Sequence, residues 1–119
     1  FVAVAEMFRH VPYYWGGKSS LGLDCSGLVQ LALEVCGVAA LRDSDMQEAT
    51  LGEKLLVNDL ESLTRGDLVF WNGHVGIMTD ARTLLHANGH HMMVAAEPLK
   101  DAVARIAARY GEITSVRRM

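Results

Sequence analysis

The sequence of 119 residues lacks the features that mark several large classes of protein. No apolar run approaches the ~20 residues that a membrane-spanning helix needs. Lysine and arginine are scattered along a chain of net charge −3, and Arg117 and Arg118 alone are too few for a nucleic-acid-binding patch. We therefore expect no membrane span and no nucleic-acid partner.

Cysteine is also scarce, with two in the chain. If one helix carries both, Cys25 and Cys36 are about 16 Å apart, whereas a disulfide needs Cα atoms within about 7 Å. Free thiols favour a reducing compartment, so we expect the cytoplasm, with the periplasm or secretion as alternatives. Because the chain begins at Phe1 without an initiator methionine, we expect it to be the C-terminal part of a longer protein.

Cys25, His74 and His86 show neither a Cys-x-x-Cys nor a His-x-x-x-His spacing among themselves, and there is no glycine-rich phosphate loop. A zinc hydrolase with Cys25, His74 and His86 as ligands is an alternative without that support, so we expect no metal and no other cofactor. No repeat or linker interrupts a chain that is 50% hydrophobic. These properties predict one domain over residues 1–119.

The expected helices come mainly before the expected strands. The patterns predict helices near residues 2–10, 25–37, 44–51 and 98–111, and strands at 68–71, 74–78, 83–87, 91–96 and 113–116. Residues 53–66 are ambiguous, while Asn72-Gly73 is a strong hairpin signal. Helices followed by an antiparallel meander predict an α+β fold rather than alternating βαβ units.

The helix expected over residues 25–37 is the most informative element. Ser26, Gln30 and Glu34 are four residues apart and form one narrow polar stripe on an otherwise apolar helix. Such a helix is buried on most faces, so Cys36 is expected to be a small buried hydrophobe. Cys25 begins the helix, where the positive end of the dipole favours a thiolate. This position makes Cys25 the candidate nucleophile, with a small buried hydrophobe as its alternative.

Two histidines are predicted to meet across the next hairpin. If its turn is centred on Asp80, His74 and His86 lie directly opposite each other, with Cβ atoms about 5 Å apart. Gly76 on the same face leaves room for a group from elsewhere. One imidazole can then hold the tautomer and orientation of the other, as in a catalytic triad. We predict His74 as general base and His86 as its orienting residue.

The remaining histidines are weaker candidates. His10 is expected at a helix end, where a cation is favourable. His90 and His91 follow a turn and are expected to face solvent or neighbouring loops. Ser44 to Gln47 matches a capping box, with Ser44 as the N-cap of a short helix.

These motifs stand in the order seen in the NlpC/P60 cysteine peptidases, which the chain resembles over almost its whole length. The matching segments are residues 12–17, 24–29, 65–70, 74–77 and 85–87. The resemblance implies a papain-like α+β fold in which the cysteine helix packs on an antiparallel sheet. It also implies a bacterial enzyme that hydrolyses the bond from γ-D-glutamyl to a diamino acid in peptidoglycan stem peptides. Cys25, His74 and His86 fall at the family's nucleophile, base and orienting residue.

Residues 42–47 look like a segment of bacterial γ-D-glutamyl-L-diamino acid endopeptidases that recycle murein peptides. In those enzymes, residues matching Tyr13, Asp24 and Ser44 line a pocket for a free N-terminal L-alanine, and we count Ser26 among the substrate-binding residues. The alternatives are a packing aromatic for Tyr13 and helix caps for Asp24 and Ser44. Such enzymes usually carry upstream SH3-like domains, and this sequence contains none.

Two other functions are compatible with the same residues. One is a papain-like amidase or acyltransferase that acts on a different acyl group. The other is a non-catalytic peptide-binding module, which usually loses the cysteine or the histidine. For an enzyme, the reaction is amide hydrolysis through an acyl-enzyme, with backbone N–H groups at the helix start, and Tyr13 as a further candidate, facing the oxyanion.

Overall fold

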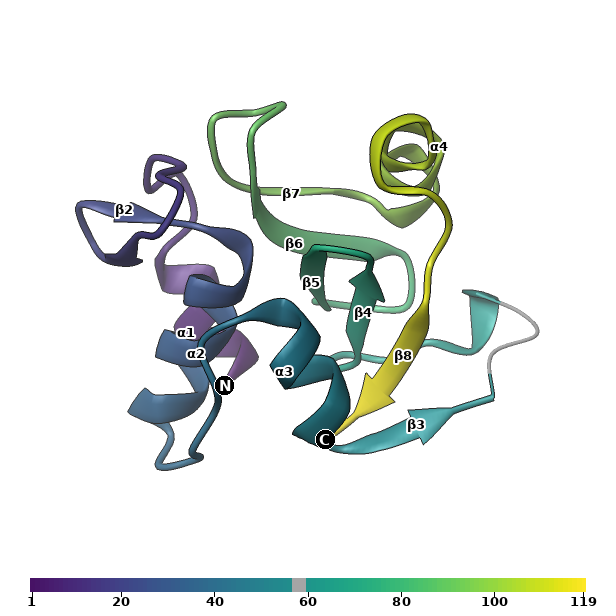
Figure 1. The fold of residues 1–119 in the computed structure, drawn as a ribbon, viewed down its shortest axis with the longest axis horizontal. Coiled ribbons are helices and arrows are strands. Elements are labelled where there is room, and N and C mark those ends of the chain that lie inside the picture. Colours follow the sequence, from purple (N-terminus) through teal and green to yellow (C-terminus); the bar gives the residue numbers. More distant parts are fainter. Residues whose placement is uncertain (57–59) are drawn as a thin grey trace.

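The computed structural model describes residues 1–56 and 60–119 and joins a group of helices to a six-stranded antiparallel sheet (Figure 1). The helices are α1 (Val2–Met7), α2 (Cys25–Val35), α3 (Ser44–Thr50), the 3-10 turn η1 (Leu60–Ser62) and α4 (Leu99–Tyr110). The α+β prediction is confirmed. None of the described helices is long and apolar enough to cross a bilayer.

The large sheet has the order β3-β8-β4-β5-β6-β7, and β1 and β2 form a small separate hairpin. The strands are β1 (Lys18–Ser19), β2 (Gly22–Leu23), β3 (Glu53–Leu55), β4 (Leu68–Trp71), β5 (His74–Met78), β6 (Thr83–Asn88), β7 (Met93–Pro98) and β8 (Ser115–Arg118). The predicted meander is confirmed for β4 to β7. The sequence did not predict that β8 returns to lie between β3 and β4.

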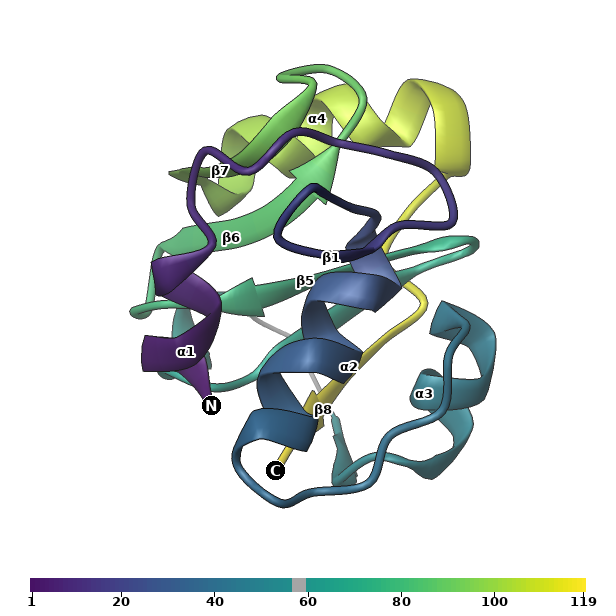
Figure 2. The same ribbon diagram turned by 90° about the vertical axis from the view of Figure 1, so that its left-hand side faces the viewer.

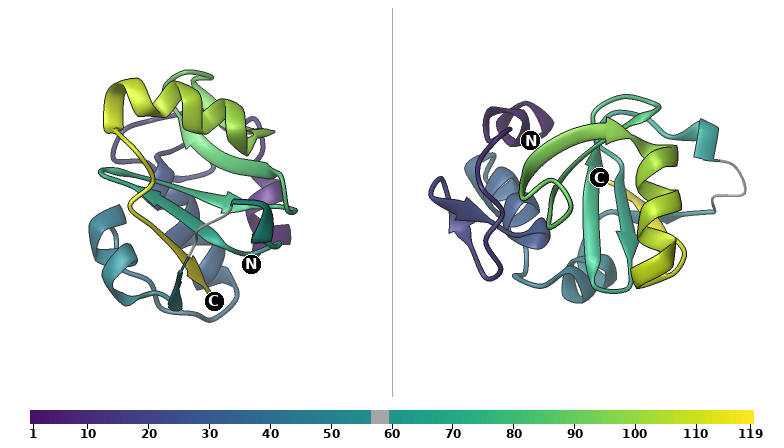
Figure 3. Two further views of the ribbon diagram at one scale, coloured as in Figure 1. Left: turned by 90° about the vertical axis from the view of Figure 1, so that its right-hand side faces the viewer. Right: turned by 90° about the horizontal axis from the view of Figure 1, so that it is seen from above.

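Helices cover both faces of this sheet (Figure 2 and Figure 3). Successive residues of a strand point to opposite faces, so Val75 and Ile77 pack with α2, whereas Met78 packs with α4. His74 lies four positions before Met78, an even spacing, so it projects from the same face of the sheet, toward α4. The two buried clusters therefore lie on opposite faces of the sheet, one against α2 and the other against α4.

The helix α2 begins and ends where the sequence predicts. The Asp24 carboxylate accepts a hydrogen bond from the Gly27 N–H at 2.7 Å, which caps the first turn. Gly37 has a positive φ of 80°, a conformation that favours glycine and ends the helix. The predicted burial of Cys36 is wrong, because it lies at the exposed C-terminal end of the helix.

The polar stripe of α2 faces protein rather than solvent over its first two turns. Ser26 and Gln30 are buried, and the Gln30 amide donates to the Ala40 carbonyl at 3.0 Å. The segment after the helix therefore folds back over the stripe. Both cysteines are free, as predicted.

The predicted capping box at Ser44 is wrong. Asp43 is the N-cap of α3, and Ser44 is its first helical residue. The Gln47 amide instead donates to the carbonyls of Ser26 at 3.0 Å and Leu41 at 2.8 Å. These bonds hold α3 against the first turn of α2, so Gln47 serves tertiary packing rather than the local helix end.

Candidate active site

Cys25 is the first residue of α2 and lies beside the start of β5. The backbone N–H groups of Val75 and Ser26 point to its sulfur and lower the pKa of the thiol, but burial outweighs them and raises it to about 11. The nearby charge of Asp24 acts in the same direction as burial. The resting cysteine is therefore a thiol, and the thiolate expected from the helix dipole does not form unaided.

His74 and His86 meet, although not in the predicted register. His74 Nε2 lies 2.7 Å from His86 Nδ1, and the rings form an edge-on pair. The strand register joins Ile77 to Leu85, and the Thr79 N–H bonds to the Thr83 carbonyl, so the turn centres one residue beyond Asp80. The two histidines are thus diagonal neighbours whose side chains bridge the offset. The prediction of directly opposite positions is wrong, while the predicted contact is confirmed.

Gly76 does not leave an open space for a distant group. A Cβ atom at this position would lie 2.5 Å from Leu84 Cδ1. Glycine is therefore needed so that Leu84 can pack between β5 and α4.

A carboxylate and a guanidinium stand behind His86. His86 Nε2 lies 2.6 Å from Glu97 Oε2, and Arg105 donates to each oxygen of Glu97 at 2.7 Å. Burial acts to raise the pKa of Glu97, but the bonds from Arg105 and His86 outweigh it and lower the pKa below its usual range. Sequence reasoning missed both residues, although a glutamate within the apolar run of β7 was an available signal.

His74 is held in a neutral state at physiological pH. Burial is the largest cause that lowers its pKa to about 3, and a proton on the neighbouring His86 would act in the same direction. Its ring stacks on Tyr110 of α4 with a centroid distance of 6.0 Å and an interplanar angle of 19°, and it also contacts Trp71. The His74 side chain, the candidate base, is therefore an uncharged imidazole fixed between aromatic rings.

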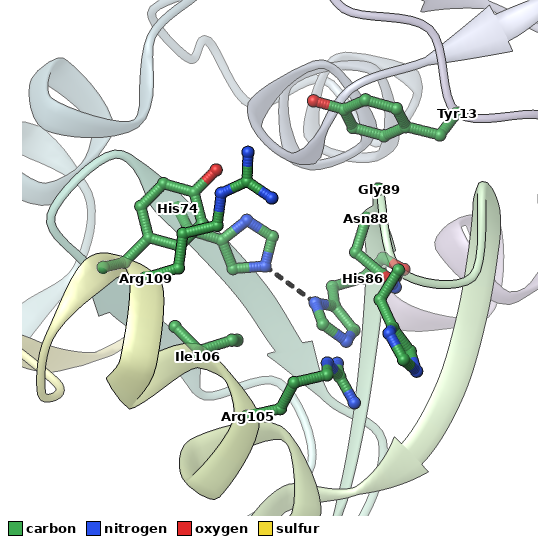
Figure 4. Close-up of a pocket in the computed structure, with 10 residues that line it drawn as sticks. Tyr13, His74, His86, Asn88, Gly89, Arg105, Ile106 and Arg109 are labelled. Carbon is green, nitrogen blue, oxygen red and sulfur yellow. Dashed lines mark hydrogen bonds between the residues drawn. The ribbon is translucent and has the colours of Figure 1, made fainter.

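A cavity of about 520 Å³ opens over the two histidines (Figure 4). Its walls are formed by Tyr13 on one side, by the turn of residues 88–90, and by Arg105, Arg109 and Tyr110 of α4 on the other. Burial raises the pKa of Tyr13, and an ionised Cys25 would raise it further, so Tyr13 lies near Cys25. Tyr13 was predicted from the sequence, whereas the contribution of α4 was not.

Asp24 is already occupied by protein donors. One oxygen accepts from the Gly27 N–H and the other from the Gly16 N–H at 3.0 Å, and Arg42 donates to both at 3.0 and 2.9 Å. The Ser26 hydroxyl accepts a further bond from Arg42 at 2.9 Å. The Asp24–Arg42 pair joins α2 to the segment before α3, on which Ser44 is half-buried.

The other histidines differ in their surroundings. His90 lines the cavity, and His91 Nδ1 lies 3.0 Å from Asn88 Oδ1 and 3.8 Å from Glu97 Oε2. Among residues 1–56 and 60–119, no group of three or more histidine, cysteine, aspartate or glutamate side chains is placed to hold a metal ion.

Comparison with known proteins relates this arrangement to a family. Residues 10–108 match the NlpC/P60 family. The chain is 36% identical over 87 residues to dipeptidyl-peptidase 6 of Lysinibacillus sphaericus, covering 73% of the chain and 31% of that protein. It is 30% identical over 94 residues to the gamma-D-glutamyl-L-lysine dipeptidyl-peptidase of Bacillus subtilis, covering 72% of the chain and 30% of that protein.

The fold is shared with a solved relative. The peptidoglycan hydrolase RipB of Mycobacterium tuberculosis superposes with a TM-score of 0.79 at 29% identity, covering 98% of the chain and 61% of RipB. The chain thus spans less than a third of the two curated relatives, while 98% of its own length superposes on RipB. The papain-like α+β prediction is confirmed, and the chain belongs to the NlpC/P60 family.

Proposed function

We propose that the protein is a cysteine endopeptidase that hydrolyses the γ-D-glutamyl–diamino acid bond of peptidoglycan stem peptides. Cys25 is the nucleophile, His74 the general base and His86 its orienting residue. The observation that carries the proposal is the 2.7 Å contact of the two histidines, at the start of the strand whose Val75 N–H points to the Cys25 sulfur. The name of the Bacillus subtilis relative supports the choice of bond.

The reaction starts from a neutral pair. The pKa of Cys25 is about 11 and that of His74 about 3, so the thiol proton moves to His74 only as sulfur attacks the carbonyl carbon. His74 then gives this proton to the leaving amine as the C–N bond breaks and a thioester remains. Water, deprotonated by His74, attacks the thioester carbonyl carbon. The C–S bond then breaks and releases the product carboxylic acid, and the proton on His74 returns to the Cys25 sulfur.

The oxyanion is held at the start of α2. Asp24 occupies the Gly27 N–H, while the N–H groups of Cys25 and Ser26 point toward the sulfur and lie beside the developing charge. The Tyr13 hydroxyl is a further donor, and it keeps its proton because burial raises its pKa. These donors act only as charge forms on the carbonyl oxygen.

A free N-terminal L-alanine is proposed to bind on the Cys25 side, between Tyr13, Asp24, Ser26 and Ser44. Because Arg42 neutralises Asp24, an ammonium would share this carboxylate with the guanidinium rather than bind it alone. We propose that upstream SH3-like domains close this side. Released peptides carry the free amine, so the proposed compartment is the cytoplasm, where the exposed thiol of Cys36 stays reduced.

The charge of the cavity fits a substrate rich in carboxylates. Arg105 is neutralised by Glu97, whereas none of the ion pairs found among the described residues includes Arg109. Arg109 therefore brings one uncompensated positive charge to the wall beside His74. Stem peptides carry carboxylates on both sides of the scissile bond, which favours them over simple neutral amides.

The test compares substrates in the full-length protein. L-Ala-γ-D-Glu-diamino acid should be cut to L-Ala-γ-D-Glu, and a Cys25→Ser variant should not cut it. Simple amides and esters should react far more slowly, and their preferential cleavage would indicate an amidase or acyltransferase instead. The N-acetylated tripeptide should be cut about ten- to a hundredfold more slowly, since a charge-assisted contact is worth about 1.5–3 kcal/mol. Equal cleavage of both peptides would refute the recycling role.

A further inference from the structure

We propose that Glu97 and Arg105 are positioning residues that fix the tautomers of the two histidines, so that Nδ1 of His74 is the nitrogen that accepts the Cys25 proton. The proposal deepens the function proposed above and rests on its roles for Cys25 and His74. It assigns to α4 a part in the chemistry, although this helix contributes no nucleophile, base or orienting residue.

The carboxylate of Glu97 is held ionised by its contacts. Arg105 donates one hydrogen bond of 2.7 Å to each oxygen, and this two-pronged, charge-assisted arrangement is the strongest that a carboxylate makes with a side chain. Arg105 has no acceptor atom, so a proton on either carboxylate oxygen would face a guanidinium N–H. The carboxylate is only 8% exposed and therefore has little access to water as a competing partner.

An ionised carboxylate can only accept hydrogen bonds. This property determines which ring nitrogen carries the hydrogen in His86 and, through it, in His74. Glu97 Oε2 lies 2.6 Å from His86 Nε2, so Nε2 of His86 must carry a hydrogen. His86 is 0% exposed, and burial lowers its pKa even against the pull of Glu97, so its ring is neutral and Nδ1 has a lone pair. That lone pair accepts the Nε2–H of His74 at 2.7 Å.

These contacts also determine the protonation of the second ring nitrogen of His74, Nδ1. A neutral imidazole carries one N–H, and Nε2 carries it, so Nδ1 has a free lone pair. If Glu97 were protonated or absent, the same two contacts would permit the opposite direction, with Nδ1–H of His86 donating to His74 Nε2. Nδ1 of His74 would then already hold a proton and could not act as base.

The proton balance is complete within the site. As the S–C bond forms, the thiol proton moves to Nδ1 of His74, and the imidazolium keeps its Nε2–H bond to His86. The same Nδ1 proton passes to the leaving nitrogen as the C–N bond breaks. Arg105 acts to lower the pKa of His74 and Glu97 acts to raise it, so the two charges oppose each other and the proposed role of the pair rests on the tautomers.

Other groups near Glu97 leave this assignment intact. His91 Nδ1 lies 3.8 Å from Glu97 Oε2, so a protonated His91 would add a second cation and hold the carboxylate ionised more firmly. Asp101, on the same helix as Arg105, acts on the guanidinium and raises its pKa. Neither group offers a hydrogen to His86 in place of the carboxylate.

The first test reads the tautomers directly and needs no substrate. Long-range nitrogen–proton NMR correlations of the wild-type protein at neutral pH should show His74 and His86 both protonated at Nε2. A proton on Nδ1 of His74 would overturn the proposal. Because this result is independent of turnover, it stays informative even if the proposed peptide bond is not the one cleaved.

The second test removes both charges together, since one alone would leave an unpaired buried charge. Glu97→Met/Arg105→Met, in a Cys36→Ser background, should show mixed tautomers at His74. The rate of Cys25 alkylation by iodoacetamide should fall about ten- to a hundredfold, the usual effect of losing such a partner. An unchanged rate with unchanged tautomers would contradict the positioning role.

The control removes a comparable pair away from the site. Arg65 and Glu6 form an exposed carboxylate–guanidinium pair at 2.6 Å. Glu6→Met/Arg65→Met in the same background should leave the tautomers and the alkylation rate unchanged. Should the Glu97→Met/Arg105→Met variant not fold, the wild-type tautomers decide the question alone.

Discussion

Two carboxylate–guanidinium pairs flank the proposed catalytic residues, Asp24–Arg42 behind Cys25 and Glu97–Arg105 behind His86. Both carboxylates are buried and both accept two bonds from one arginine. Asp24 also accepts hydrogen bonds from the Ser26 hydroxyl at 3.4 Å and from two backbone N–H groups, which fix the helix and the loop before it. Glu97 instead makes its remaining hydrogen bond with the imidazole of His86, a group that can gain or lose a proton. The same type of ion pair therefore stabilises local structure beside Cys25, whereas beside His86 it is proposed to fix the positions of the histidine protons.

The largest expected effect is on turnover, and it concerns the two histidines beside the Glu97–Arg105 pair. His74→Ala should lower turnover by about 10⁴-fold or more, because a residue that transfers the proton is lost. His86→Gln should lower it by only about ten- to a hundredfold, since an amide oxygen can still accept the His74 Nε2–H. Steady-state kinetics with His10→Ala as an exposed control measures the difference. An active His74→Ala with a dead His86→Gln would reverse the two roles.

The next effect tests the Cys25 side through stability. Asp24→Ala removes the cap of α2 and leaves Arg42 without its carboxylate, so the free energy of unfolding should fall by about 3 kcal/mol. Asp43→Ala is the matched control, because Asp43 is the N-cap of α3 but makes no side-chain capping bond. Its unfolding free energy should change by less than about 0.5 kcal/mol. Equal losses in denaturant titrations would remove the distinction between these two caps.

Acid should weaken the histidine side first. The pKa of His74 is lowered to about 3, so between this value and the usual ~6.5 the unfolded chain binds a proton that the folded chain does not. Stability should therefore fall as the pH drops below about 6.5, by about 1.4 kcal/mol per pH unit from this residue. Thermal melts from pH 7 to pH 4 should show a shallower slope in His74→Gln. His10→Gln, at an exposed position, should keep the wild-type slope.

The smallest effect concerns the two thiols at opposite ends of α2. Cys36 is exposed, whereas burial raises the pKa of Cys25 to about 11, so iodoacetamide at neutral pH should modify Cys36 first. Peptide mass mapping gives the order. In a Cys36→Ser background, His74→Ala should slow the labelling of Cys25 further. Faster labelling of Cys25 than of Cys36 in the wild type would show that the resting thiol is more ionised than its burial implies.

Features set by neighbouring residues could be predicted from the sequence. The Asn72-Gly73 hairpin, the start of α2 at Cys25 and the contact of the two histidines all follow from local patterns. The register of β5 and β6 was predicted wrongly because it depends on where the turn near Asp80 is centred. Moving the centre of the turn by one residue changes the partner of every residue in the two strands. The burial of Cys36 was wrong because an apolar residue near a helix end can lie beyond the core that covers its middle.

The ion pairs between arginines and buried carboxylates could not be predicted from the sequence. Arg42 reaches Asp24 from 18 residues away, and Arg105 reaches Glu97 only because α4 turns back over β7. No periodicity relates such positions, since the angle at which a helix leaves a strand decides which side chains meet. The glutamate in β7 was visible as an anomaly, but its partner and its line to His74 required the folded structure.

The place of β8 also sets an order of events during synthesis. This strand lies between β3 and β4, and Arg118 binds the buried carboxylate of Asp67 at 2.8 and 2.9 Å. During synthesis on the ribosome, about fifty further residues are added after Asp67 and β4 before residues 115–118 can pair with them. Cys25 and both histidines are made well before that moment. The sheet that carries His74 and His86 is therefore completed late, so the site formed by Cys25 and the two histidines is complete only when residues 115–118 have been translated.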